Sequence, residues 1–112
     1  MREPVLNRRL VLERAQRTDD GAGGHKLAWQ TAGILWAEVT STTGRGVAAP
    51  AGALSRVTHR IRVRAAPAGA PSRPVAGQRL REGARIFRII AVTESDTRGR
   101  FLTCLAEEEG VQ

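Results

Sequence analysis

Residues 85–106 read RIFRIIAVTESDTRGRFLTCLA, and this stretch decides the class of fold. Two apolar runs, residues 85–93 and 100–106, flank the polar and glycine-containing turn of residues 94–99. Short runs rich in β-branched and aromatic residues on either side of such a turn are typical of a β-hairpin. Apolar residues fall on both faces of the first run, so we expect that strand to be central in its sheet and buried on two sides.

Working outward from this hairpin, other stretches alternate apolar and polar residues with the period of a strand. The clearest covers residues 57–65, two more cover residues 6–14 and 34–40, and a short strand is expected within residues 75–81. No stretch shows the periodicity of an amphipathic helix of ordinary length. The sequence therefore predicts an all-β fold, a small antiparallel β-barrel or sandwich of five to six strands, as a single domain over residues 1–112.

The composition limits the kinds of site that the chain can hold. Of its 112 residues, 41% are hydrophobic and 26% are charged, which is ordinary for a globular domain. One cysteine cannot form an internal disulfide, and the two histidines leave little material for a metal centre. No apolar run approaches the roughly 20 residues of a membrane span, and the N-terminus lacks a signal-peptide pattern. We therefore expect no metal, no cofactor and no membrane contact.

The sequence offers no catalytic constellation, so we expect the protein not to be an enzyme and assign no catalytic residue. The acidic clusters at Asp19-Asp20 and at residues 107–109 are expected to be solvated charges, the second in a frayed tail. Cys104 is expected to be a small buried hydrophobe. His59 lies on the apolar face of its strand, which is typical of a core or interface histidine rather than a general base.

The basic residues are the most unusual feature of the chain. There are 18 basic residues against 11 acidic ones, and Lys26 is the only lysine among them. Four of the arginines form a stripe along one face of the strand at residues 57–65, with steps of roughly 6.6 Å. This arginine stripe consists of Arg56, Arg60, Arg62 and Arg64. Such a stripe indicates contact with a polyanion or with carboxylates of another protein. Stacking of single-stranded nucleic acid is disfavoured, since aromatic residues are scarce.

The order of these features resembles that of the head–tail joining proteins, also called head-closure or stopper proteins, of siphovirus-type particles. The segments that carry the resemblance are Trp-Ala-Glu-Val at 36–39, Thr-His-Arg-Ile at 58–61 and the closing hairpin at 85–106. The family often has an acidic residue soon after the loop glycine, where this chain has Gly46. The arginine- and alanine-rich composition looks like that of a high-GC bacterial genome. Gene transfer agents, which resemble defective siphoviruses, carry a component of this kind.

This resemblance implies a structural protein in the neck of a virion-like particle, assembled in the bacterial cytoplasm. Such proteins form a ring below the adaptor and portal complex, on the order of six or twelve copies here. The ring closes the channel over the packaged double-stranded DNA and presents a platform for the tail terminator or tail tube. The arginine stripe would then face a neighbouring subunit or the DNA.

In this family the loop after the second strand projects toward the channel. In this chain the corresponding channel loop is long, rich in glycine, alanine and proline, and without periodicity, which is typical of a functional or mobile loop. It consists of Thr43, Gly44, Arg45, Gly46, Val47, Ala48, Ala49, Pro50, Ala51, Gly52, Ala53 and Leu54. Whether this loop plugs the channel or only lines it is left open.

Two other functions stay open at the level of sequence. One is a small β-barrel module that binds nucleic acid through the arginine stripe; the other is a neighbouring neck component such as a tail terminator. A module that binds DNA should lose affinity with salt at a log–log slope of roughly −0.9 per neutralised phosphate. A stopper should show weak, unspecific binding at most.

Overall fold

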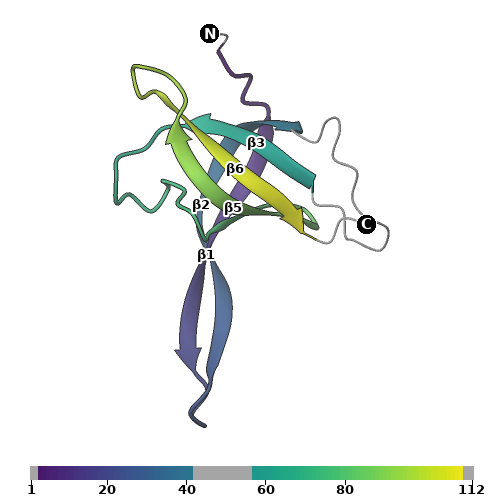
Figure 1. Cartoon of the computed structure of the whole chain (residues 1–112). Helices are drawn as coiled ribbons and strands as arrows, with labels where there is room; N and C mark the ends of the chain where they lie inside the picture. Colours follow the sequence, from purple (N-terminus) through teal and green to yellow (C-terminus); the bar gives the residue numbers. More distant parts are fainter. Residues whose placement is uncertain (1–2, 42–56, 110–112) are drawn as a thin grey trace.

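The computed structural model describes residues 3–41 and 57–109 (Figure 1). Its six strands are β1 (Arg8–Asp19), β2 (His25–Ser41), β3 (Val57–Arg64), β4 (Arg79–Glu82), β5 (Arg85–Glu94) and β6 (Phe101–Glu109). The channel loop, Thr43–Leu54, and Arg56 lie outside the described residues. The part of the chain that the structure describes contains no helix long and apolar enough to cross a membrane.

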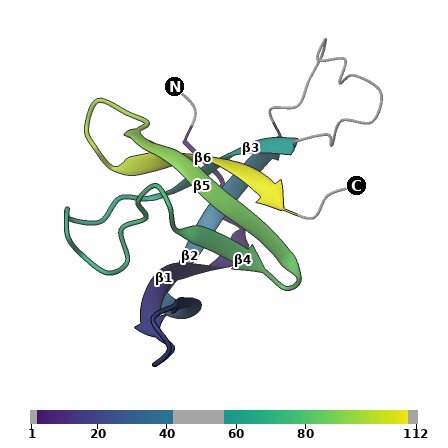
Figure 2. The same cartoon turned by 60° about the horizontal axis from the view of Figure 1, so that its bottom comes forward.

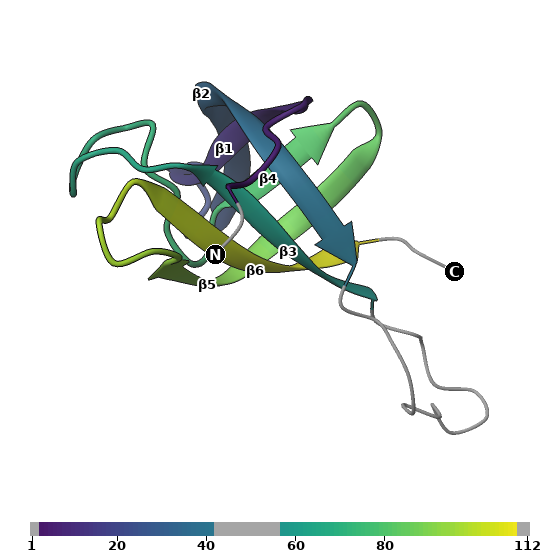
Figure 3. The same ribbon diagram turned by 90° about the horizontal axis from the view of Figure 1, so that it is seen from above.

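All neighbouring strands pair antiparallel, in the order β1-β2-β3-β6-β5-β4, and β4 pairs with β1 to close a barrel. Figures 2 and 3 show the strands wrapping around a common centre. The predicted all-β fold is therefore confirmed, and of the two predicted architectures the chain adopts the barrel. The closing contact is short, because only Val11, Leu12 and Glu13 of β1 pair with β4.

The inside of the barrel is filled by the inward-facing residues of all six strands, since side chains alternate between the two faces of a barrel wall. The buried core comprises Leu10, Leu12, Ala37, Ile61, Val63, Leu80, Phe87, Ile89, Leu102, Cys104 and Ala106. Phe87 is the largest of the fully buried side chains. The alternation read from the sequence identified this inner face correctly along β3 and in the barrel part of β1 and β2.

The prediction that residues 85–93 form a strand buried on two sides was wrong. Strand β5 has one buried face, with Phe87 and Ile89 inside, whereas Ile90 is 41% exposed. The register against β6 shifts between Ile89 and Ala91, so Ile90 is the extra residue of a β-bulge. After the bulge the alternation is inverted, and Val92 packs against the core. The sequence therefore shows apolar residues on both faces because the inward-facing positions change from odd-numbered to even-numbered residues at the bulge.

Strands β1 and β2 continue beyond the barrel as a two-stranded hairpin, which we call the arm (residues 13–31). Residue pairs run from Glu13 opposite Thr31 to Asp19 opposite His25, and the register shifts at the point where the arm leaves the barrel. Figure 1 shows the arm projecting from the barrel, at the bottom of the view. The expected strands, residues 6–14 and 34–40, were too short, because most arm residues are exposed and lack the alternation that a buried face imposes.

Candidate functional site

The three described members of the arginine stripe lie on the outer face of β3, as their alternation predicted. Arg60 is exposed, and its strand position is opposite Leu105 of β6. Arg62 Nη1 lies 4.0 Å from Glu38 Oε1, and the Arg64 guanidinium lies 5.9 Å from the centre of the Phe101 ring. The Arg62 and Arg64 guanidinium groups therefore lie near other side chains of the barrel, whereas the exposed Arg60 forms no ion pair with a described residue.

A chain of arginine–carboxylate pairs that ends at a histidine lies at the end of the barrel near Ser41 and Val57. We call it the ionic chain; it comprises Arg8, Glu82, Arg85, Glu108 and His59, from five different strands. Glu82 receives two hydrogen bonds from the Arg8 guanidinium and lies 3.8 Å from Arg85 Nη1. Arg85 donates to both Glu108 oxygens, at 2.8 and 2.9 Å, and His59 Nε2 lies 2.9 Å from Glu108 Oε1. Apart from Glu82 and Arg85, which are three residues apart, the ionic chain thus links residues that are distant in the sequence.

The arginines of the ionic chain keep its carboxylates charged. The hydrogen bond from Arg8 holds the pKa of Glu82 below its usual value, and the hydrogen bond from Arg85 does the same for Glu108. His59 is buried, its ring is perpendicular to that of Phe87 at 5.1 Å, and its Nδ1 atom has no partner among the described atoms. The expected core histidine is confirmed. The expectation of a frayed tail was wrong for residues 107–109, because they belong to β6 and Glu108 pairs with Arg85 and His59.

The base of the arm is held against the barrel by a second ionic cluster, which we call the arm clamp. Glu13 is 5% exposed and accepts hydrogen bonds from Arg79 Nε at 2.7 Å and Arg81 Nε at 3.0 Å. The Arg79 guanidinium also stacks on the Trp29 ring of the arm, 4.1 Å from its centre. Burial alone would raise the pKa of Glu13, but the two arginines more than offset this and hold the pKa below its usual value.

Beyond its clamp, the arm has two different faces. The cross-strand pairs Ala15–Trp29, Arg17–Leu27 and Asp19–His25 share the face that carries Glu13, because every second residue of a strand points the same way. Leu27 is 64% exposed at the middle of this face. The opposite face is polar and carries Arg14, Gln16, Thr18, Lys26, Ala28 and Gln30. The arm therefore presents one apolar and charged face that the barrel does not cover.

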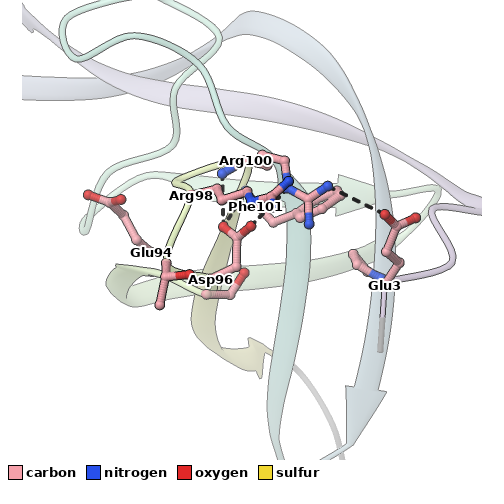
Figure 4. A pocket seen from close by; sticks show the side chains of 9 residues that line it. Glu3, Glu94, Asp96, Arg98, Arg100 and Phe101 are labelled. Atoms are coloured by element: carbon pink, nitrogen blue, oxygen red, sulfur yellow. Dashed lines mark hydrogen bonds and ion pairs between the residues drawn. The ribbon is translucent and has the colours of Figure 1, made fainter. Parts of the chain in front are cut away.

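A surface pocket of about 490 Å³ lies at the β5–β6 turn (Figure 4). Its lining residues are Glu3, Pro4, Glu94, Ser95, Asp96, Thr97, Arg98, Arg100 and Phe101. Asp96 fixes the turn by accepting hydrogen bonds from the backbone N–H of Arg100 at 2.8 Å and from Arg100 Nε at 3.0 Å. Arg100 Nη1 also lies 3.5 Å from Glu3 Oε1, which ties the N-terminal segment to the pocket.

The one thiol of the chain is buried, and several of its described carboxylates are paired with arginines. Cys104 is fully buried, and burial raises the pKa of its thiol to about 12, so it is a core side chain and not a nucleophile. Within residues 3–41 and 57–109, no group of three or more His, Cys, Asp or Glu side chains is arranged to hold a metal ion. The ionic chain and the arm clamp consist mainly of arginine–carboxylate pairs between strands.

Sequence reasoning located the arginine stripe but missed the arm, the arm clamp and the pocket. The clamp joins Glu13 and Trp29 to Arg79, which follows a long irregular connection. No local pattern marks such a contact, because it depends on barrel closure between β1 and β4. The one available signal was Trp29 itself, a large aromatic residue next to a polar, glycine-rich segment.

Comparison with known proteins gives consistent results. A family model described as "Phage head completion protein" matches residues 1–109. A solved chain from the virion of a native gene transfer agent particle is 55% identical, with a TM-score of 0.83, over 98% of this chain and 100% of that chain. The solution structure of protein SF1141 from Shigella flexneri 2a shares the fold at 22% identity and a TM-score of 0.70, over the full length of both chains. No curated protein matched the sequence.

Proposed function

The chain belongs to the phage head completion protein family, and from this premise we propose that it closes the DNA channel after packaging and joins head to tail. The observation that carries the proposal is the 55% identity, over 98% of the chain, to a chain of a gene transfer agent virion. Identity of this extent, together with the family description, supports a structural role in a phage-like particle. The comparisons give no support to a nucleic-acid-binding module.

In this proposal several copies form a ring, on the order of six or twelve, around the channel axis. The adaptor and portal complex lies above the ring, and the tail terminator or tail tube lies below it. A closed ring uses one face of each copy against a different face of the next, so the subunit needs two complementary surfaces. The barrel supplies a rigid frame, and the arm and the pocket are two distinct surface features of the kind that such contacts require.

Within the same proposal, the channel loop, Thr43–Leu54, is directed toward the channel, where Arg45 lies near DNA phosphates. The arginine stripe faces a neighbouring copy or the packaged DNA. Support for the stripe comes from Arg60, whose exposed side chain projects from the outer wall. Charge reversal at Arg60 and Arg62 together is expected to impair assembly; intact assembly would remove the stripe from the proposal.

Electron microscopy of particles from cells lacking this gene tests the function directly. We expect separate tails beside heads that have lost their DNA, because an unclosed channel neither retains DNA nor accepts a tail. Supplying the gene in trans should restore joined, filled particles and serves as the control. Joined, DNA-filled particles in the absence of the gene would refute the proposed function.

A further inference from the structure

The projecting part of the arm lacks the packing that normally stabilises a β-hairpin. Isolated two-stranded hairpins are marginally stable in water, and a third strand or another packing surface is usually required. Leu27 is 64% exposed, and neither Arg17 nor Asp19, its neighbours on the same face, forms an ion pair with any described residue. This face is therefore suited to contact another surface.

The arm clamp sets the direction of the arm before any partner binds. Glu13 is buried between Arg79 and Arg81, and Arg79 stacks on Trp29. A contact element held in its bound orientation loses less conformational entropy on association than a flexible one. The clamp thus makes the arm a preformed docking element.

The pocket at the β5–β6 turn has chemistry that complements this arm face. Pro4 and Phe101 provide apolar lining for Leu27, and Figure 4 shows Glu94 and Glu3 on the two sides of the pocket. Glu94 and Arg98 form no ion pair with the described part of the chain. Opposite charges are therefore available for Arg17 and for Asp19.

We propose that, in the ring, the arm of one copy docks in the pocket of the next copy. In this contact Leu27 enters the pocket, Arg17 pairs with Glu94, and Asp19 pairs with Arg98. The proposal rests on the proposed function, because it names the surfaces that join the copies of the ring. Within residues 3–41 and 57–109 none of these four charged side chains forms an ion pair, and a second copy carries both halves of the contact.

The positions of the two features suit a head-to-tail contact. The arm projects from one end of the barrel, and the β5–β6 turn lies toward the opposite end, in both Figure 1 and Figure 2. A copy cannot place its own arm in its own pocket in this arrangement. Each copy therefore uses different surfaces toward its two neighbours, which is the heterologous type of contact that closes into a ring.

Cross-linking in assembled particles tests the contact. A chain carrying Leu27→Cys and Thr97→Cys, treated with a short bismaleimide, should give a ladder of covalently joined copies. Buried Cys104 does not react with the reagent, so each single variant should give no ladder. The matched control pairs Leu27→Cys with Ala84→Cys, which is exposed on the β4–β5 turn, and should also give none.

A charge exchange tests the chemistry of the same contact. Arg17→Glu and Glu94→Arg should each lower the yield of joined particles by about tenfold, because each brings like charges together. Combining the two substitutions restores an opposite pair and should recover most of the yield. Arg14→Glu, on the other face of the arm, is the matched control and should leave the yield within about twofold of the native value.

The outcomes separate this inference from the proposed function. Normally joined particles without any Leu27–Thr97 ladder would overturn the docking and leave the head-closure role intact. A cross-link from Leu27→Cys to a different particle protein would also overturn it, by assigning the arm to another neck component. Joined, filled particles without the gene would instead refute the proposed function.

Discussion

At the scale of single residues, two carboxylates organise several of the described charged groups of this basic protein: Glu13, which is buried, and Glu108, which is partly buried. Glu13 lies between Arg79 and Arg81, and Glu108 lies between Arg85 and His59. Exposed ion pairs contribute little to stability, whereas a buried carboxylate leaves its partners unsatisfied when it is removed. The stability of the barrel should therefore depend on these carboxylates far more than on the exposed charges.

Replacing Glu13 with Ala should destabilise the fold by about 2–3 kcal/mol, because two charge-assisted hydrogen bonds are lost and two arginines are left without a partner. Urea unfolding followed by tryptophan fluorescence measures the change. Glu109→Ala, at an exposed position, is the matched control and should stay within about 0.5 kcal/mol of the native chain. Equal effects for the two variants would contradict the account of the clamp.

Acid should destabilise the barrel through the same carboxylates. The pKa values of Glu13, Glu82 and Glu108 are lowered from 4.5 in the folded chain, so their contribution is complete above that pH. The contribution is lost as the pH falls through the lowered folded values, because the unfolded chain then binds more protons. Thermal unfolding, measured from neutral pH down to about pH 3, should show Tm falling steeply only in the acid range.

Arg85→Gln is the matched test of this pH dependence. The hydrogen bond from Arg85 is the largest cause of the lowered pKa of Glu108. The variant should be less stable at neutral pH, and its Tm should fall less between neutral and acid conditions. If Tm of the variant fell as much between neutral and acid pH as Tm of the native chain, Glu108 would not contribute to the acid destabilisation.

At the scale of elements, the β4–β5 hairpin depends on a glycine in its two-residue turn. Gly83 has φ of 59°, and only glycine adopts positive φ as the first central residue of such a turn without strain. A Cβ atom at Gly83 would meet no atom within 4 Å, so the cost of a side chain is one of backbone conformation alone. The neighbouring positions Glu82 and Arg85 both belong to the ionic chain.

Gly83→Ala should therefore cost about 1 kcal/mol, measured by urea unfolding. Gly33→Ala is the control, because Gly33 does not have positive φ and its added Cβ would lie 3.7 Å from Ser72, an ordinary contact. That variant should remain within about 0.5 kcal/mol of the native chain. The reverse order of the two effects would contradict the assigned turn.

At the scale of the whole molecule, barrel closure joins the first strand to the fourth, and β6 is paired along both of its sides, with β3 and with β5. Cys104 lies on β6, is fully buried in the core, and has a pKa raised to about 12. It becomes accessible only when the wall opens. Its reactivity is therefore a probe of opening of the barrel as one unit.

Iodoacetamide should label Cys104 in the folded chain on the order of 10³-fold more slowly than in urea. The measurement is mass spectrometry of the alkylated chain over time. The Leu27→Cys variant is the control, since its added thiol lies on the exposed arm and should react at once. Rapid labelling of Cys104 would show that β6 separates from its neighbours locally.

The sequence by itself determined the strand content, most of the core and the family. In a strand every second residue points to the same side, so the sequence pattern indicates which residues share a face. This was sufficient to predict the inner face of β3 and the position of the arginine stripe. Only the tertiary structure decided the phase change at Ile90, the arm and the pairs that join Glu13 to Arg79 and Glu108 to His59. The physical reason is that alternation is local, whereas a bulge, a projection and a closing strand pair depend on which strand lies beside which.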